Sequence, residues 1–277
     1  MKTILLPTDF SDTAYHAAEY ACMLTRQFGA KRLILFHAYQ TLVSIADVPG
    51  AIPLNGDELR QNSEAELLKL YHLLKPLADS QTEISYLAEE AGVPLSFNAM
   101  AERLGVDLIV MGITGKSKIE QQLIGSNAIH VAKESNFPVI IVPPSAALEN
   151  VQRIVFACDL KKIAGTTAIP RLKKVLDAFH AKVLVLNVDH KEKNFRPETA
   201  IELKELYEAL EGYGAEFNYT DNADAATGIM EFARQEDASL IITIPKNYGF
   251  FEGLFRSSTT KKLAYQTNVP LLLLHEA

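Results

Sequence analysis

The stretch Asp107-Leu108-Ile109-Val110-Met111-Gly112-Ile113-Thr114-Gly115 is separated by nine residues from Gly125-Ser126-Asn127. Its first half is an apolar run without polar alternation, which is typical of a strand buried on both faces of a parallel sheet. Glycines after such a strand let the backbone approach a ligand closely. A helix that opens at Gly125-Ser126 offers unpaired N–H groups and a positive dipole end. We therefore predict that a phosphate-bearing small molecule binds at the end of this strand.

The chain repeats itself once, at offsets of 150 and 132 positions. Matching apolar runs start at Thr3 and Arg153, at Arg32 and Lys182, and at Asp107 and Ser239. The matches indicate two copies of one domain. The second copy lacks 18 residues (150 − 132) that the first carries around Val43–Gly56. We assign residues 1–145 to the first domain and residues 151–277 to the second, with a proline-bearing linker between them.

Each copy carries five short apolar runs without polar alternation, as in strands buried on both faces of a parallel sheet, and stretches with helical spacing separate these runs. The runs are Thr3–Leu6, Leu33–Phe36, Ile84–Leu87, Leu108–Met111 and Val139–Val142, then Ile154–Ala157, Val183–Leu186, Glu216–Tyr219, Leu240–Ile244 and Leu271–Leu274. Strands that alternate with helices indicate right-handed crossovers and an open α/β sheet. We expect two tandem α/β domains, each with an open sheet of five parallel strands.

Composition places the chain among ordinary globular proteins and excludes some partners. It has 277 residues, of which 48% are hydrophobic and 22% charged, with a net charge of −7. This acidic balance argues against general nucleic-acid binding, which depends on Lys and Arg. The two cysteines, Cys22 and Cys158, do not make a disulfide framework, which favours a reducing compartment. No run is long enough for a membrane helix, and we expect a soluble cytoplasmic protein.

The spacing Gly-x2-Gly-x9-Gly-Ser, with Pro7-Thr8-Asp9 at the end of the first expected strand, resembles the ATP-binding branch of the universal stress protein family. The matching positions are Gly112, Gly115, Gly125 and Ser126. The resemblance implies a Rossmann-like strand order 3-2-1-4-5 in each domain and a regulatory or sensor role in the stress response. It also implies pairing through the last strands, with Val139–Val142 approaching Leu271–Leu274 within one chain. Association of two chains as a homodimer stays open.

The same resemblance implies a role for each site residue. Asp9 would lie by the nucleoside of ATP, the backbone of Ala38 would pair with the adenine edge, and glycines would wrap the ribose and phosphates. The residues expected to bind the nucleotide are Pro7, Asp9, Ala38, Met111, Gly112, Gly115, Gly125, Ser126 and Asn127. Mg²⁺ would come with the triphosphate rather than from a cage of protein ligands. We expect valine at Gly112 or Gly125 to abolish binding with little unfolding.

Other interpretations of these residues stay open. Asp9 and Ser11 precede an expected helix and could simply cap it, and Gly112 or Gly115 could be an ordinary turn glycine. The chain could then be a nucleotide-independent interaction or scaffold protein of the same fold. No Ser-His-Asp grouping or paired carboxylates stand near the loop, so we expect slow ATP hydrolysis at most.

The second copy departs from the glycine motif. Ile244, Asn247 and Ser257 stand where the first copy has its three glycines, and only Ser258 matches. A β-branched side chain would obstruct the close approach of backbone to phosphate. We therefore expect the second domain not to bind ATP.

Overall fold

The structure, a computed structural model, describes residues 1–39, 56–90, 95–113, 131, 135–160, 168–190, 197–244 and 267–274. All ten apolar runs form strands. The strands of the first half are β1 (Thr3–Pro7), β2 (Arg32–Tyr39), β3 (Glu83–Glu90), β4 (Leu108–Gly112) and β5 (Val139–Val142). Those of the second half are β6 (Arg153–Ala157), β7 (Lys182–Asp189), β8 (Glu216–Asp221), β9 (Leu240–Thr243) and β10 (Leu271–Leu273).

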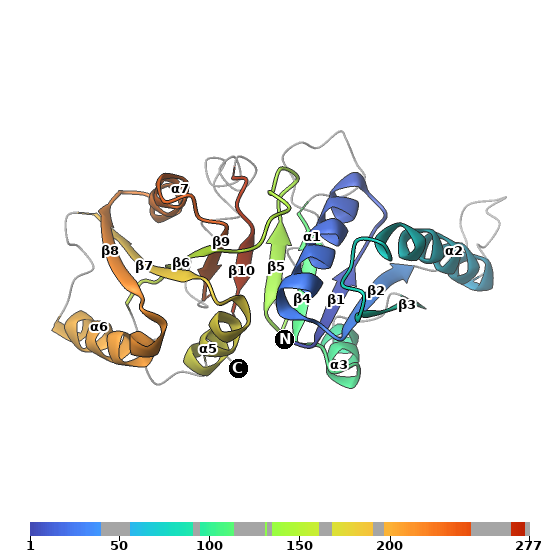
Figure 1. The fold of residues 1–277 in the computed structure, drawn as a ribbon, viewed down its shortest axis with the longest axis horizontal. Helices are drawn as coiled ribbons and strands as arrows, with labels where there is room; N and C mark the ends of the chain where they lie inside the picture. Colours follow the sequence, from blue (N-terminus) through green and yellow to red (C-terminus); the bar gives the residue numbers. More distant parts are fainter. Residues whose placement is uncertain are drawn as a thin grey trace, which may run out of the picture.

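The strands form one continuous sheet in the order β3-β2-β1-β4-β5-β10-β9-β6-β7-β8. Each half therefore has the expected order 3-2-1-4-5, and its strands are parallel. The two halves meet where β5 and β10 pair antiparallel, with Leu272 opposite Ile140. Figure 1 shows these two strands side by side at the centre of the molecule. The expected pairing of the last strands is confirmed, and it removes both as open sheet edges.

Helices connect the strands on both faces of the sheet. They are α1 (Asp12–Phe28), α2 (Gly56–Leu74), α3 (Leu95–Arg103), α5 (Ala168–Phe179), α6 (Pro197–Leu210) and α7 (Ala225–Gln235), with a short 3-10 helix, η1 (Glu211–Tyr213). The limits of α1 follow from its caps. The Ser11 side chain accepts a hydrogen bond from the Ala14 N–H at the start, and Gly29 takes a left-handed conformation at the end.

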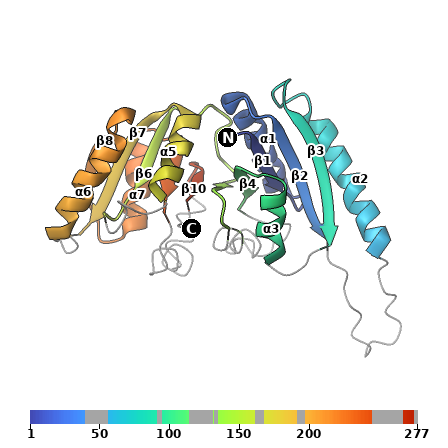
Figure 2. The same cartoon turned by 90° about the horizontal axis from the view of Figure 1, so that it is seen from below.

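The hydrophobic core is continuous on one face of the sheet and divided on the other. Side chains of α1, α2, α5 and α6 share one cluster with residues from both halves of the sheet, such as Leu108 and Leu240. On the opposite face, α3 and α7 cover separate clusters. Figure 2 shows α2 and α6 at opposite ends of the molecule, so the shared core runs along its whole length. The two halves are therefore packed as one body on the face of α1 and α5.

The outermost strands correct one expectation. The runs at Ile84–Leu87 and Glu216–Tyr219 were predicted as strands buried on both faces. They form β3 and β8, but these lie at the two edges of the sheet, and none of their residues is fully buried. An edge strand has a neighbour on one side only, so its ends and outer face stay accessible to water.

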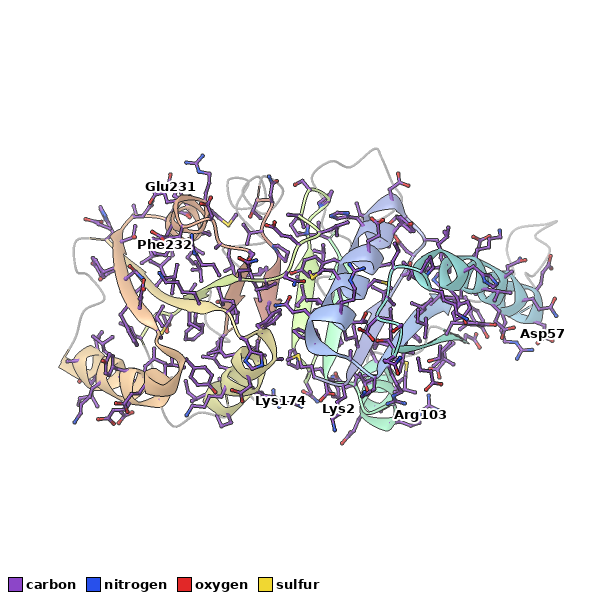
Figure 3. The ribbon with its side chains drawn as sticks, in the orientation of Figure 1. Lys2, Asp57, Arg103, Lys174, Glu231 and Phe232 are labelled. Atoms are coloured by element: carbon purple, nitrogen blue, oxygen red, sulfur yellow. The ribbon has the colours of Figure 1, made fainter. Side chains whose placement is uncertain are left out.

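Polar and aromatic side chains join the two halves beside the central strands. Gln27 at the end of α1 accepts a hydrogen bond from the Val151 N–H at 2.9 Å and donates to the Val151 carbonyl at 2.9 Å. The rings of Phe28 and Phe179 pack edge to face, 4.8 Å apart. Lys174 of α5 forms an ion pair of 2.6 Å with Asp107, and Figure 3 shows Lys174 and Lys2 near this junction.

Two kinds of feature are absent from the part of the chain that the structure describes. None of its helices has the length and apolar character needed to cross a membrane. Nor do its histidines, cysteines and carboxylates gather in threes at a place that could hold a metal ion.

Candidate functional site

The candidate site lies where the strand order of the first half reverses. Strand β1 has β2 on one side and β4 on the other. Because these strands are parallel, their carboxyl ends, at Pro7, Tyr39 and Gly112, lie along one edge of the sheet. Ligands of open α/β sheets bind in the crevice outside this edge, at the point of reversal. The topology therefore brings the first part of the sequence motif to the expected place.

Strand β2 continues past the end of β1. The last residue of β1, Pro7, pairs with Phe36, so His37, Ala38 and Tyr39 extend beside the loop that follows β1. Ala38 is exposed at this edge. An exposed strand end next to a loop leaves backbone groups accessible to a ligand, as the expected contact with an adenine edge requires.

Asp9 has a local structural role at the start of α1. Its carboxylate accepts hydrogen bonds from the Ser11 N–H at 3.0 Å and the Ser11 hydroxyl at 2.6 Å. Ser11 itself caps the helix, because its Oγ accepts from the Ala14 N–H at 3.2 Å. Asp9 therefore does not cap the helix directly but orients the residue that does. Its side chain is half-buried, so part of it stays accessible at the strand edge.

Gly112 lies against the first turn of α1. A Cβ atom on Gly112 would be 2.7 Å from the carbonyl oxygen of Thr13 and 2.9 Å from its carbonyl carbon. These are backbone atoms, which cannot move aside as a flexible side chain can. The expectation that Gly112→Val causes little unfolding is therefore wrong, because valine would force β4 and α1 apart.

The described part of the site contains Pro7, Asp9, Ala38, Met111 and Gly112, and all of them lie at the end of β1, β2 or β4. Met111 is 6% exposed, and its side chain belongs to the core beneath α3. We therefore expect any contact of Met111 with a ligand to involve its backbone. Gly115, Gly125, Ser126 and Asn127 lie outside the described residues, as do Asn247, Ser257 and Ser258.

Sequence reasoning missed two residues beside Asp9. His37 is not among the expected site residues, but its Nδ1 lies 2.7 Å from the carbonyl oxygen of Thr8. The Thr8 hydroxyl also accepts a hydrogen bond from the Phe10 N–H at 3.0 Å. The alignment of the two copies carried the signal, since Asn187, a side chain that can also donate, stands at the position of His37.

Comparison with known proteins gives a consistent result. The model of the universal stress protein family matches residues 1–143 and again residues 150–275. Universal stress protein MJ0531 of Methanocaldococcus jannaschii is 30% identical over 142 residues, which cover 51% of this chain and 81% of that protein. Universal stress protein MJ0577 of the same organism is 30% identical over 154 residues, 51% of this chain and 94% of the relative.

A solved structure matches the whole chain rather than one half. The crystal structure of a universal stress protein from Archaeoglobus fulgidus aligns with a TM-score of 0.71 and 18% identity. The alignment covers 99% of this chain and 96% of the other. At this identity the likeness shows the fold alone, which is the tandem arrangement of the present chain.

Proposed function

Because the chain belongs to the universal stress protein family, we propose that it is a stress-response regulator whose first half binds ATP or another adenine nucleotide. One observation carries the proposal. Asp9, in the loop after β1, and Gly112, the last residue of β4, lie at the carboxyl ends of adjacent strands where the strand order reverses. The glycine-bearing loop continues directly from Gly112 in the sequence.

In the proposed complex the ligand is held chiefly by backbone groups. The exposed end of β2 at Ala38 meets the adenine edge, and Asp9 and Pro7 lie by the nucleoside. Gly115, Gly125, Ser126 and Asn127 hold the phosphates through N–H groups and the Ser126 hydroxyl. This manner of binding is compatible with a net charge of −7, since it needs no cluster of basic side chains. Mg²⁺ enters with the triphosphate.

We propose that the second half leaves this ligand unbound. The position of Gly112 is taken by Ile244, which is 7% exposed. The position of Ala38 is taken by Val188, and α7 lies directly on it, because a Cβ on Gly228 would be 2.7 Å from Val188 Cγ1. Both positions carry a larger side chain than the glycine and alanine of the first half.

The proposed role is binding and regulation, with slow hydrolysis at most. Neither the motif nor the described residues around it supply a paired base and nucleophile of the kind that efficient hydrolysis uses. A ligand that binds only the native state stabilises it by about 2.7 kcal/mol at a hundred times its dissociation constant. A change in the nucleotide concentration would thereby alter the conformation or the partners of this protein. We propose that this regulation takes place in the cytoplasm.

The test is calorimetric titration of nucleotide-free protein with Mg-ATP, in wild type and two matched variants. Gly125→Val adds a side chain in the motif of the first copy, and Ser257→Val adds one at the equivalent position of the second. We expect Gly125→Val to abolish binding and Ser257→Val to leave the affinity unchanged, with both variants unfolding near the wild-type temperature. Unchanged affinity in Gly125→Val would refute the assigned site. No binding to wild type at millimolar Mg-ATP would favour the nucleotide-independent interaction protein.

A further inference from the structure

The loop after the first strand has the same hydrogen bonds in both halves, although its residues differ. In the first half the Thr8 N–H donates to the Phe36 carbonyl at 2.8 Å. In the second, at an offset of 150, the Cys158 N–H donates to the Leu186 carbonyl at 2.9 Å. Dissimilar residues therefore anchor the start of each loop to the neighbouring strand by an equivalent backbone hydrogen bond.

Each loop also places a bulky residue in a left-handed backbone conformation. Phe10 has φ = 61° and its counterpart Leu160 has φ = 52°. The Phe10 N–H donates to Thr8 Oγ1 at 3.0 Å, and the Leu160 N–H donates to Cys158 Sγ at 3.3 Å. Bulky side chains rarely adopt this conformation, which persists only where the surroundings enforce it. Something outside the loop must therefore hold it in both halves.

In each half a side chain from the next strand contacts the loop. His37 Nδ1 lies 2.7 Å from the Thr8 carbonyl oxygen, and Asn187 Nδ2 donates to the Cys158 carbonyl at 2.9 Å. A carbonyl oxygen only accepts, so His37 must carry its hydrogen on Nδ1. Histidine and asparagine share little except an N–H donor at this reach. Both halves thus share a side-chain N–H on the second strand that donates to the carbonyl of the residue before the aspartate.

We propose that His37 and Asn187 are positioning residues. Each holds this carbonyl in place and thereby fixes the orientation of the following aspartate, Asp9 or Asp159, at the carboxyl end of its strand. The peptide group between Thr8 and Asp9 cannot turn without breaking the bond from His37. The ring of Phe10 packs against that of His37, with the two centroids 4.5 Å apart. In the first half the consequence for nucleotide affinity rests on the function proposed above, whereas the control of loop geometry does not.

Amide hydrogen exchange in His37→Ala, His37→Asn and Asn187→Ala tests the positioning role without any ligand. In His37→Ala we expect the Phe10 and Ser11 amides to exchange roughly five- to ten-fold faster, the effect of losing about one net hydrogen bond. The Leu160 amide of the same molecule should keep its wild-type rate. Asn187→Ala should give the reverse pattern, and His37→Asn should restore slow exchange at Phe10.

The same samples decide between local positioning and a general structural role. If His37→Ala speeds exchange at Phe10 and Leu160 equally, or at neither, the positioning role is refuted. A further check is the tautomer of His37, which nitrogen-detected NMR should show as protonated on Nδ1. Protonation on Nε2 alone in the neutral ring would exclude the bond to Thr8.

Titration with Mg-ATP separates this inference from the proposed function. We expect His37→Ala to weaken binding roughly five- to ten-fold and His37→Asn to recover affinity to within about two-fold of wild type. If wild type binds Mg-ATP and His37→Ala binds it equally well, the effect on the ligand is refuted while the nucleotide site stands. If wild type does not bind, the proposed function falls, and the exchange result still decides the positioning role.

Discussion

A methyl group on Gly112 would lie 2.7 Å from the carbonyl oxygen of Thr13. The end of β4 and the first turn of α1 are therefore in direct backbone contact at the proposed site. Gly112 is therefore needed for the fold whether or not a ligand binds, because this contact joins the strand that carries the motif to the helix that Ser11 caps. Substitution of Gly112 would therefore disturb the fold as well as the proposed binding, so the binding role is better tested at Gly125.

Gly112→Ala should destabilise the protein by about 1–3 kcal/mol, the usual cost of forcing an extra methyl group into packed structure. Urea unfolding measures the difference. Gly212→Ala is the matched control, since a Cβ there has no heavy atom within 4 Å, and its stability should stay within about 0.5 kcal/mol of wild type. Equal stability of the two variants would contradict the close contact.

Gln27→Ala should loosen the junction of the two halves. The side chain bonds to both backbone groups of Val151 and donates to the Phe179 carbonyl at 3.3 Å. Its removal leaves these groups without their protein partner, and we expect a loss of about 1–3 kcal/mol of unfolding free energy. The exposed Gln81 provides a control, Gln81→Ala, which should be nearly neutral. A Gln27→Ala protein as stable as Gln81→Ala would show that the junction does not depend on this side chain.

Asp107 should make stability depend on acid pH. Partial burial acts to raise the pKa of its carboxyl, but hydrogen bonds from Lys174 and from the Lys2 and Thr3 N–H groups outweigh this effect and lower it. A lowered pKa in the folded state gives stability that is present above the unfolded pKa, near 4, and is lost as pH falls through the folded value. Asp107→Asn should therefore be less stable than wild type at pH 7, and the gap should close toward pH 3.

The comparison for Asp107 is urea unfolding of both proteins at several pH values between 7 and 3. Lys174→Gln, which removes the 2.6 Å partner, should shift the acid loss of stability to higher pH. An equal difference between wild type and Asp107→Asn at both ends of this range would show that the carboxylate charge contributes nothing.

Gly105 and Asp237 occupy equivalent left-handed turns after α3 and α7, with φ of 63° and 49°. The next residue closes the turn in the same way, by Val106 N–H to the Ala101 carbonyl at 3.0 Å and Ala238 N–H to the Ala233 carbonyl at 2.8 Å. Gly105→Ala should cost about 1–2 kcal/mol, because a Cβ is strained in this conformation. Asp237→Gly should be within about 0.5 kcal/mol of wild type, since relief of strain offsets the added freedom of the unfolded chain. Thermal unfolding of both variants measures these changes. A Gly105→Ala protein as stable as wild type would contradict the expected strain.

The strands and their order could be predicted because buried apolar runs mark them directly and the family resemblance supplies the order. The burial of the third run in each half was misjudged from its apolar residues alone, although the order 3-2-1-4-5 that the resemblance implies places this strand at an edge of the sheet. The continuous core beneath α1 and α5 also escaped prediction, since it follows from how the halves pack rather than from either repeat.

At the candidate site, the sequence alone could not show whether Asp9 or Ser11 caps the helix. Both residues are common helix caps, and only the atomic contacts show that Ser11 caps while Asp9 orients it. The left-handed conformation of Phe10 and Leu160 could not be predicted from the sequence, because neither residue type favours such a turn. The close contact of Gly112 with Thr13 depends on helix placement, which spacing cannot supply.

We expect the first half of this chain to have one working nucleotide site and the second half to have none. The most direct measurement is the stoichiometry of Mg-ATP bound to nucleotide-free protein, from calorimetric titration at known protein concentration. If the assignment of both halves is right, close to one ATP binds per chain. Two per chain would contradict the assignment of the second half, and none at millimolar Mg-ATP would contradict the nucleotide site itself.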